Sequence, residues 1–158
     1  MQYTLRQMRE TVGLSLETYR HWKRVLPTIA GKSGRSPCFS IGDLVAASVI
    51  QRLTDTAGVR VGHLKDVSVG IFELCNGASW AALENAVLAI DLELRTCQVR
   101  RSTPSSNAGG LTLLCALDPV LDELRAALWQ RQIGQDQAEL RFPPTQIGNS
   151  PERSQDRA

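Results

Sequence analysis

The sequence is poor in the residues that build metal and redox sites. Of its 158 residues, only two are histidines and four are cysteines. The cysteines lie far apart and form no CxxC pair, so nothing has the ligand spacing of a zinc site. We therefore expect no metal and no cofactor, and we expect the cysteines to pack as small apolar side chains. The four are Cys38, Cys75, Cys97 and Cys115.

Long apolar segments and catalytic constellations are also missing. No run approaches the roughly 18–20 apolar residues that span a bilayer. The N-terminal segment MQYTLRQMRE has no apolar stretch of the signal-peptide kind. These absences predict a cytoplasmic protein. Because the sequence has no nucleophile–base pair, no phosphate-binding loop and no catalytic carboxylate pattern, we expect a protein that is not an enzyme.

The net charge of +2 conceals an asymmetry along the chain. Residues 1–65 contain ten Lys or Arg and four Asp or Glu, which gives a net charge of +6. Residues 66–158 contain eight and twelve, which gives −4. A basic N-terminal third joined to an acidic remainder is expected when one end of a protein meets a polyanion such as DNA. Chance clustering of solvated charge is the alternative.

Two short helices are predicted at the N-terminus. Residues 4–12 have apolar side chains at helical spacing, Thr4 as a possible cap and Gly13 to end the helix. Ser15 is a good cap for a second helix over 16–26. Two short helices joined by a turn that contains glycine are typical of a helix-turn-helix unit.

The middle of the sequence predicts a loop followed by two more helices. The segment 28–40 contains two glycines, three serines and a proline, which predict a loop or a short β-hairpin. Lys32 and Arg35 would lie near its tip. The apolar spacing then predicts a third helix over 41–57 and a fourth over about 61–77.

The C-terminal half is less regular. Residues 79–100 fit both the alternation of a strand and the apolar spacing of a helix, and we favour a short helix to about Ala86 followed by a strand. A buried strand is predicted over 111–117 and a helix from Asp118. The polar residues after about Gln132 predict a disordered tail.

The N-terminal segment resembles the opening of MerR-family winged-helix regulators. In that family a Gly-Val-Ser turn commonly precedes a helix that reads T-L-R-Y-Y/W-E, and this chain has Gly13-Leu14-Ser15 followed by Thr18-Tyr19-Arg20-His21-Trp22-Lys23. The family then has a wing that ends in an aromatic and a serine, an acidic-Leu pair and a helix that closes on glycine. This chain matches over about 3–65, with Cys38-Phe39-Ser40, Asp43-Leu44, Gly58 and Val61-Gly62-His63-Leu64 in that order.

The chain also departs from the family pattern. Lys23 replaces the usual acidic residue, Tyr19 replaces the usual leucine, and the paired cysteines of the metal-sensing members are missing. The resemblance therefore implies DNA binding and says little about an effector.

A recognition helix needs hydrogen-bond donors on its outer face for base edges and phosphates. The polar face of the second helix supplies five candidate DNA contacts. The segment 28–40, which corresponds to the wing of the MerR family, supplies two more that would reach a neighbouring phosphate or the minor groove. For each charged residue the alternative is a solvated face. The candidates are Thr18, Arg20, His21, Lys23 and Arg24 on the helix, and Lys32 and Arg35 on the wing.

Together these features predict an α+β protein in which a winged helix-turn-helix of the MerR type is followed by a small α/β dimerisation segment. The alternative is a mostly α protein with a coiled-coil dimer helix. The expected organisation is a DNA-binding domain over 1–77, a dimerisation or effector segment over 78–131 and a tail over 132–158.

The predicted function is that of a dimeric, sequence-specific transcriptional regulator of bacterial or mobile-element origin, bound to double-stranded DNA in the nucleoid. An excisionase-like or architectural DNA-binding factor is a second interpretation. A protein-interaction adaptor with a degenerate winged helix is a third, and the sequence leaves a small-molecule effector open.

Overall fold

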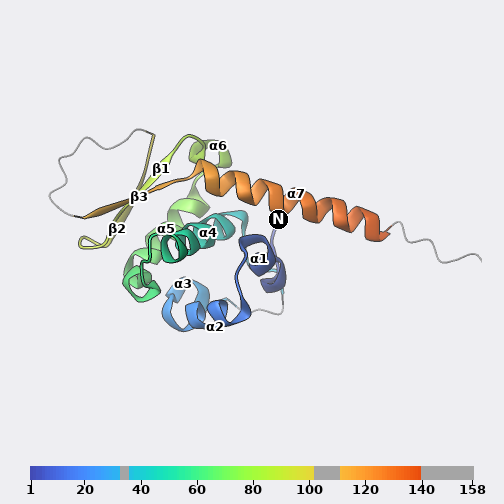
Figure 1. Ribbon diagram of the computed structural model, residues 1–158, viewed down its shortest axis with the longest axis horizontal. Helices are drawn as coiled ribbons and strands as arrows, with labels where there is room; N and C mark the ends of the chain where they lie inside the picture. The colour runs from blue at the N-terminus through green and yellow to red at the C-terminus, as the bar shows by residue number, and fades with distance from the viewer. Residues whose placement is uncertain (33–35, 102–110, 140–158) are drawn as a thin grey trace, which may run out of the picture.

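The computed structural model describes residues 1–32, 36–101 and 111–139, and it confirms the α+β class: helices come first, and a small antiparallel sheet and a long helix follow (Figure 1). In chain order the elements are α1 (Leu5–Val12), α2 (Leu16–Val25), α3 (Pro27–Ala30), α4 (Ile41–Asp55), the 3-10 helix η1 (Val61–Leu64), α5 (Lys65–Gly77), α6 (Trp80–Leu83), β1 (Val87–Asp91), β2 (Thr96–Arg100), β3 (Thr112–Ala116) and α7 (Asp118–Glu139).

The first two helices begin and end at the residues that the sequence indicates. Thr4 caps α1 in a capping box with Gln7, and Ser15 accepts a hydrogen bond from the backbone N–H of Thr18 at the start of α2. Gly13 ends α1 in the left-handed conformation, with φ of 81°. A residue with a Cβ is strained there, so glycine allows the sharp turn between the two helices.

Helix α4 is the central element of the core. Most of its residues are buried, and it packs against α1, α5 and α7. Gly42 allows the closest of these approaches, because a Cβ on it would lie 2.6 Å from the carbonyl oxygen of Cys75 in α5. Burial on nearly every side explains why α4 can be so apolar for a helix in a small protein.

The segment 28–40 differs from the predicted loop or hairpin. It begins within α3, which has Pro27 at its first position, where proline needs no hydrogen-bond partner for its nitrogen. Within the described residues of this segment, the β structure is a single bridge between Phe39 and Tyr3. Arg35 lies outside the described residues.

The segment 79–100 forms a helix and a β-hairpin instead of a helix and one strand. The helix is α6, which ends earlier than expected, and the hairpin joins β1 to β2. The Asp91 carboxylate accepts hydrogen bonds from the backbone N–H groups of Glu93 and Leu94, and Arg95 adopts a left-handed φ of 56°. The prediction was wrong here because apolar alternation continues through this turn, whereas the turn itself depends on a side-chain-to-backbone contact.

The sheet has the strand order β2-β1-β3 and both pairings are antiparallel. The strand predicted over 111–117 is present as β3, but the expected burial is wrong: Cys115 is the only buried residue of β3, and Leu114 is 47% exposed, because β3 is an edge strand of the sheet. Leu88 and Ile90 of the central strand are fully buried, and α5 packs against β2. The sheet therefore covers one end of the helical body, as Figure 1 shows.

Helix α7 begins at Asp118 as predicted but runs on to Glu139, past the limit expected near Gln132. It packs against α4 and α1. One hydrophobic cluster includes residues from both predicted segments, such as Trp22 and Ile50 with Leu88 and Leu121. Among the described residues, no helix is both long enough and apolar enough to cross a membrane.

Candidate nucleic-acid interface

Helix α2 is anchored in the core by the aromatic side chains on one of its own faces. Tyr19 and Trp22 are buried, and Leu26, directly after the helix, is completely buried. The Tyr19 ring meets Phe39 edge-on, with a centroid distance of 6.5 Å and an interplanar angle of 76°. Because one side of α2 is anchored in this way, the opposite side faces outward.

The outward side of α2 brings together four of the five contacts predicted on this helix, whereas Lys23 is exposed but does not line the same depression. Glu17, Arg20, His21 and Arg24 follow the i, i+3, i+4, i+7 spacing of one helical face. With Thr18 they line one shallow depression on the surface. Each of these four side chains is exposed, whereas Thr18 is half-buried and shares a 2.8 Å hydrogen bond with the hydroxyl of the capping Ser15.

The cations of α2 lack the ion pairs that other arginines make. Within the described part of the chain, none of the salt bridges includes Arg20, His21, Lys23 or Arg24. By contrast, five other arginines each lie within ion-pair distance of a carboxylate: Arg6, Arg52, Arg95, Arg125 and Arg131. The unpaired positive charge of the described N-terminal helices is therefore concentrated on α2, where it can meet phosphates without first losing a protein partner.

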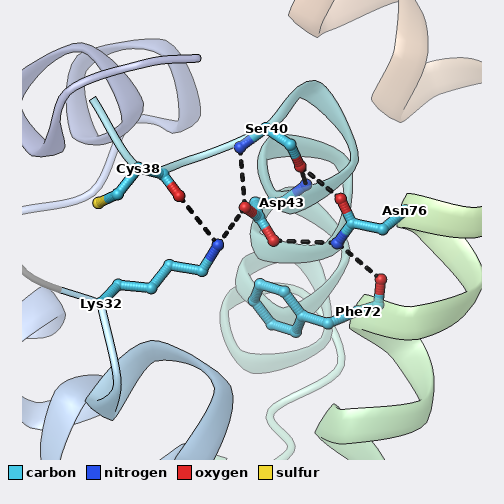
Figure 2. Close-up of polar contacts among 6 residues, drawn as sticks. All are labelled: Lys32, Cys38, Ser40, Asp43, Phe72 and Asn76. Carbon is cyan, nitrogen blue, oxygen red and sulfur yellow. Dashed lines mark hydrogen bonds and ion pairs between the residues drawn. The ribbon is translucent and has the colours of Figure 1, made fainter. Parts of the chain in front are cut away.

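Lys32, which the sequence places on a DNA-contacting wing, points into the protein instead. Its ammonium pairs with the buried carboxylate of Asp43 at the start of α4 and donates a 3.1 Å hydrogen bond to the carbonyl oxygen of Cys38 (Figure 2). The same carboxylate accepts from the backbone N–H of Ser40 at 2.8 Å and from the side-chain amide of Asn76 at 3.0 Å. Lys32 thus belongs to a polar network that joins three segments of the chain.

Asn76 completes this network at the end of α5. Its amide also donates to the carbonyl oxygen of Phe72 at 2.9 Å, and its own oxygen accepts from the Ser40 hydroxyl. Burial of Asp43 would by itself raise the pKa of the carboxyl. Hydrogen bonds from Lys32, Asn76 and the Ser40 backbone outweigh that effect, so the pKa lies below its ordinary value and Asp43 is ionised at neutral pH.

The structure adds three exposed basic side chains that are not among the predicted DNA contacts. Arg60, His63 and Lys65 are exposed on and beside η1, and η1 packs against α2. They belong to the basic N-terminal third, but no helix or wing pattern singled them out. Only the folded chain shows that they lie near α2.

The cysteines do not form a reactive centre in the described residues. Cys75 and Cys115 are buried and Cys38 and Cys97 are half-buried. Burial, with smaller contributions from Cys97, Cys115 and Asp43, raises the pKa of the Cys75 thiol to about 12, so this thiol stays protonated at neutral pH. Within the same residues, no group of three or more His, Cys, Asp and Glu is arranged to hold a metal ion.

Comparison of this chain with protein-family models, with curated proteins and with solved structures found no match. The candidate interface is therefore defined by the geometry of α2 and of the residues around it.

Proposed function

We propose that this chain is a sequence-specific DNA-binding protein and that α2 is the helix that enters the major groove. The observation that carries the proposal is the outer face of α2, where Arg20, Lys23 and Arg24 are exposed and form no ion pair within the described residues. Positive charge that is not neutralised inside the protein is available to phosphates.

The dimensions of α2 suit this role. An α-helix with its side chains is about 10–12 Å across, which fits a major groove about 12 Å wide, and the ten residues of α2 give it a length of about 15 Å. Arg20 lies in the middle of the helix and can reach the O6 and N7 acceptors of a guanine. Lys23 and Arg24 lie in the last turn and are better placed for phosphates.

The order of elements supports the winged helix-turn-helix type that the MerR resemblance implies. A capped helix, a left-handed glycine, a second capped helix and a segment tied back to Tyr3 by a β-bridge follow one another. Arg35 stays a predicted wing contact. In this proposal the protein regulates transcription, and genomic footprinting would separate promoter operators from the attachment sites that a recombination factor would occupy.

Two copies of the chain are proposed to act together through α7. An apolar groove of about 700 Å³ lies beside this helix, and its apolar lining is formed by Ile41, Trp80, Leu128 and Trp129. Trp129, which lines this groove, is 66% exposed, so a twofold contact would bury the same apolar patch of both copies. Arg125 lies over the Trp80 ring at 5.2 Å, at the rim where a second aromatic ring could also stack.

The DNA contact is tested with Arg20→Ala in the full-length protein. A duplex enriched from a random-sequence library by the wild-type protein serves as the specific site, and a scrambled duplex serves as the reference. If Arg20 contacts a base, the variant loses about 1–3 kcal/mol of specific binding, roughly 5- to 150-fold in Kd, and relaxes the preference at one base position. Fluorescence anisotropy measures both duplexes.

Arg101→Ala is the matched control, because Arg101 is exposed, forms no salt bridge within the described residues and lies far along the chain from α2. Its affinity should stay close to that of the wild type. Equal losses of affinity in both variants would mean that Arg20 acts only through the net charge of the protein. A wild-type protein that enriches no duplex would overturn the proposed function.

A further inference from the structure

Lys32 is connected to the recognition helix by a short series of contacts. Its ammonium lies 5.2 Å from the centre of the Phe39 ring, and that ring packs edge-on against Tyr19 of α2. On its other side the ammonium pairs with Asp43, which Asn76 holds from the end of α5. The network therefore extends from α5 through the start of α4 to Phe39, whose ring packs against Tyr19 of α2.

The position of Lys32 is unsuited to a phosphate contact. Its side chain is 24% exposed, and the Asp43 side chain that it pairs with is 4% exposed. If the ammonium turned outward to DNA, it would leave a buried carboxylate without its cation, which is strongly unfavourable. It would also release the Cys38 carbonyl oxygen and the Phe39 ring.

We propose that Lys32 is a positioning residue for DNA recognition and that it makes no contact with DNA. It holds the Phe39 ring in place, and through the contact of that ring with Tyr19 it fixes the position of α2. The inference rests on the proposed function of α2, and it reverses the role that the sequence suggests for this lysine. It also assigns a purpose to the Asp43–Asn76 hydrogen bond, which joins residues 33 positions apart and holds the carboxylate in place from α5.

Lys32→Met and Lys23→Met distinguish the two possible roles of a basic residue. Lys23 is exposed on α2 and has no ion pair in the described residues, so its removal should weaken specific and non-specific binding alike and reduce the salt slope of log K by about one. If Lys32 is a positioning residue, Lys32→Met should weaken specific binding roughly 10-fold or more, leave non-specific binding within about 2-fold and leave the salt slope unchanged.

Each outcome of the binding experiment bears on the proposal. A fall in both affinities with a smaller salt slope would make Lys32 a phosphate contact and overturn the inference. Equal falls in the two affinities with an unchanged slope would reduce the effect to a loss of folded protein and would also overturn the inference. Lys32→Arg, which keeps the cation, should recover most of the specificity.

A measurement without DNA keeps this inference separate from the proposed function. In two-dimensional NMR spectra of the full chain, Lys32→Met should shift the ring resonances of Tyr19 and Phe39, whereas Lys23→Met should leave the Phe39 resonances in place. If these shifts occur but the wild-type protein binds no duplex, the structural link stands and the proposed function fails. If Lys32→Met does not fold, Lys32→Gln retains a hydrogen-bond donor and carries the same test. Unchanged ring resonances in the Lys32 variants would overturn the link.

Discussion

Asp43 shows how strongly one buried carboxylate can depend on its neighbours. Its side chain caps α4 and accepts hydrogen bonds from Ser40 and Asn76, and it pairs with Lys32. Burial disfavours the charged form, but these partners favour it more, so the folded protein lowers the pKa of Asp43 from its ordinary value of 3.8. A carboxyl whose pKa is lower in the folded state stabilises the fold when it is ionised.

The stability that Asp43 contributes should therefore be present at neutral pH and disappear in acid. It is complete well above pH 3.8 and is lost as the pH falls through the lower pKa of the folded state. At pH 7, Asp43→Asn should lower the free energy of unfolding by about 1.5–3 kcal/mol, the worth of hydrogen bonds to a charged group. Urea denaturation of both proteins from pH 7 to pH 3 should show this difference shrinking in acid. Parallel curves would contradict it.

At the scale of elements, the helix termini could be predicted and the helix contacts could not. Thr4, Gly13 and Ser15 lie where helix ends were expected, because each acts on backbone groups within a few residues. The crossing of α4 and α5 depends on Gly42, whose missing side chain leaves room for a backbone more than thirty residues further along.

Gly42→Ala should separate α4 from α5. The added Cβ would lie 2.6 Å from the Cys75 carbonyl oxygen and 2.7 Å from the Cα of Asn76, so backbone must move. We expect a loss of about 1–3 kcal/mol in the free energy of unfolding, more than the gain in helix propensity. Gly62→Ala is the control, since nothing lies within 4 Å of a Cβ there, and its stability should change little. Similar thermal midpoints for both variants would exclude this packing role.

At the scale of the whole molecule, the basic helix α2 and the long α7 lie on different parts of the body. Figure 1 shows α2 at the edge of the helical body and the C-terminal half of α7 extending away from it. Among residues 118–132 of α7, the last fully buried side chain is that of Leu124, whereas Leu128 and Arg131 are half-buried and Trp129 is exposed. Helices in proteins gain most of their stability from packing, so the exposed Trp129 favours a second copy as the partner of α7.

Trp129→Glu tests that pairing. The proposed contact is small, because α7 is about 33 Å long and one face of it offers less than the roughly 800 Å² per partner of a stable complex. We therefore expect a weak dimer whose sedimentation coefficient rises with protein concentration, and a variant that stays monomeric. Leu94→Glu is the control, since Leu94 is equally apolar and exposed but lies in the β1–β2 turn. Dissociation by the Leu94 variant alone would move the contact to the sheet.

How much could be predicted from sequence alone depends on the distance over which each feature is determined. The capped helices, the glycine turn, the β3 strand and the basic face of α2 follow from residues close in sequence, so their caps, spacing and charge were sufficient. These local features determine the α+β class and the face that we propose for DNA.

Tertiary structure decided the rest. Lys32 has the same charge as Arg20, but it faces inward because Asp43 and Phe39 are brought to it by the fold. The Asp91 turn divides an alternating segment into two strands, and Arg60 and Lys65 come near α2 only through η1. In each case the deciding interaction either joins groups that are far apart in sequence or is a hydrogen bond of a side chain. Neither can be predicted from the spacing of apolar residues.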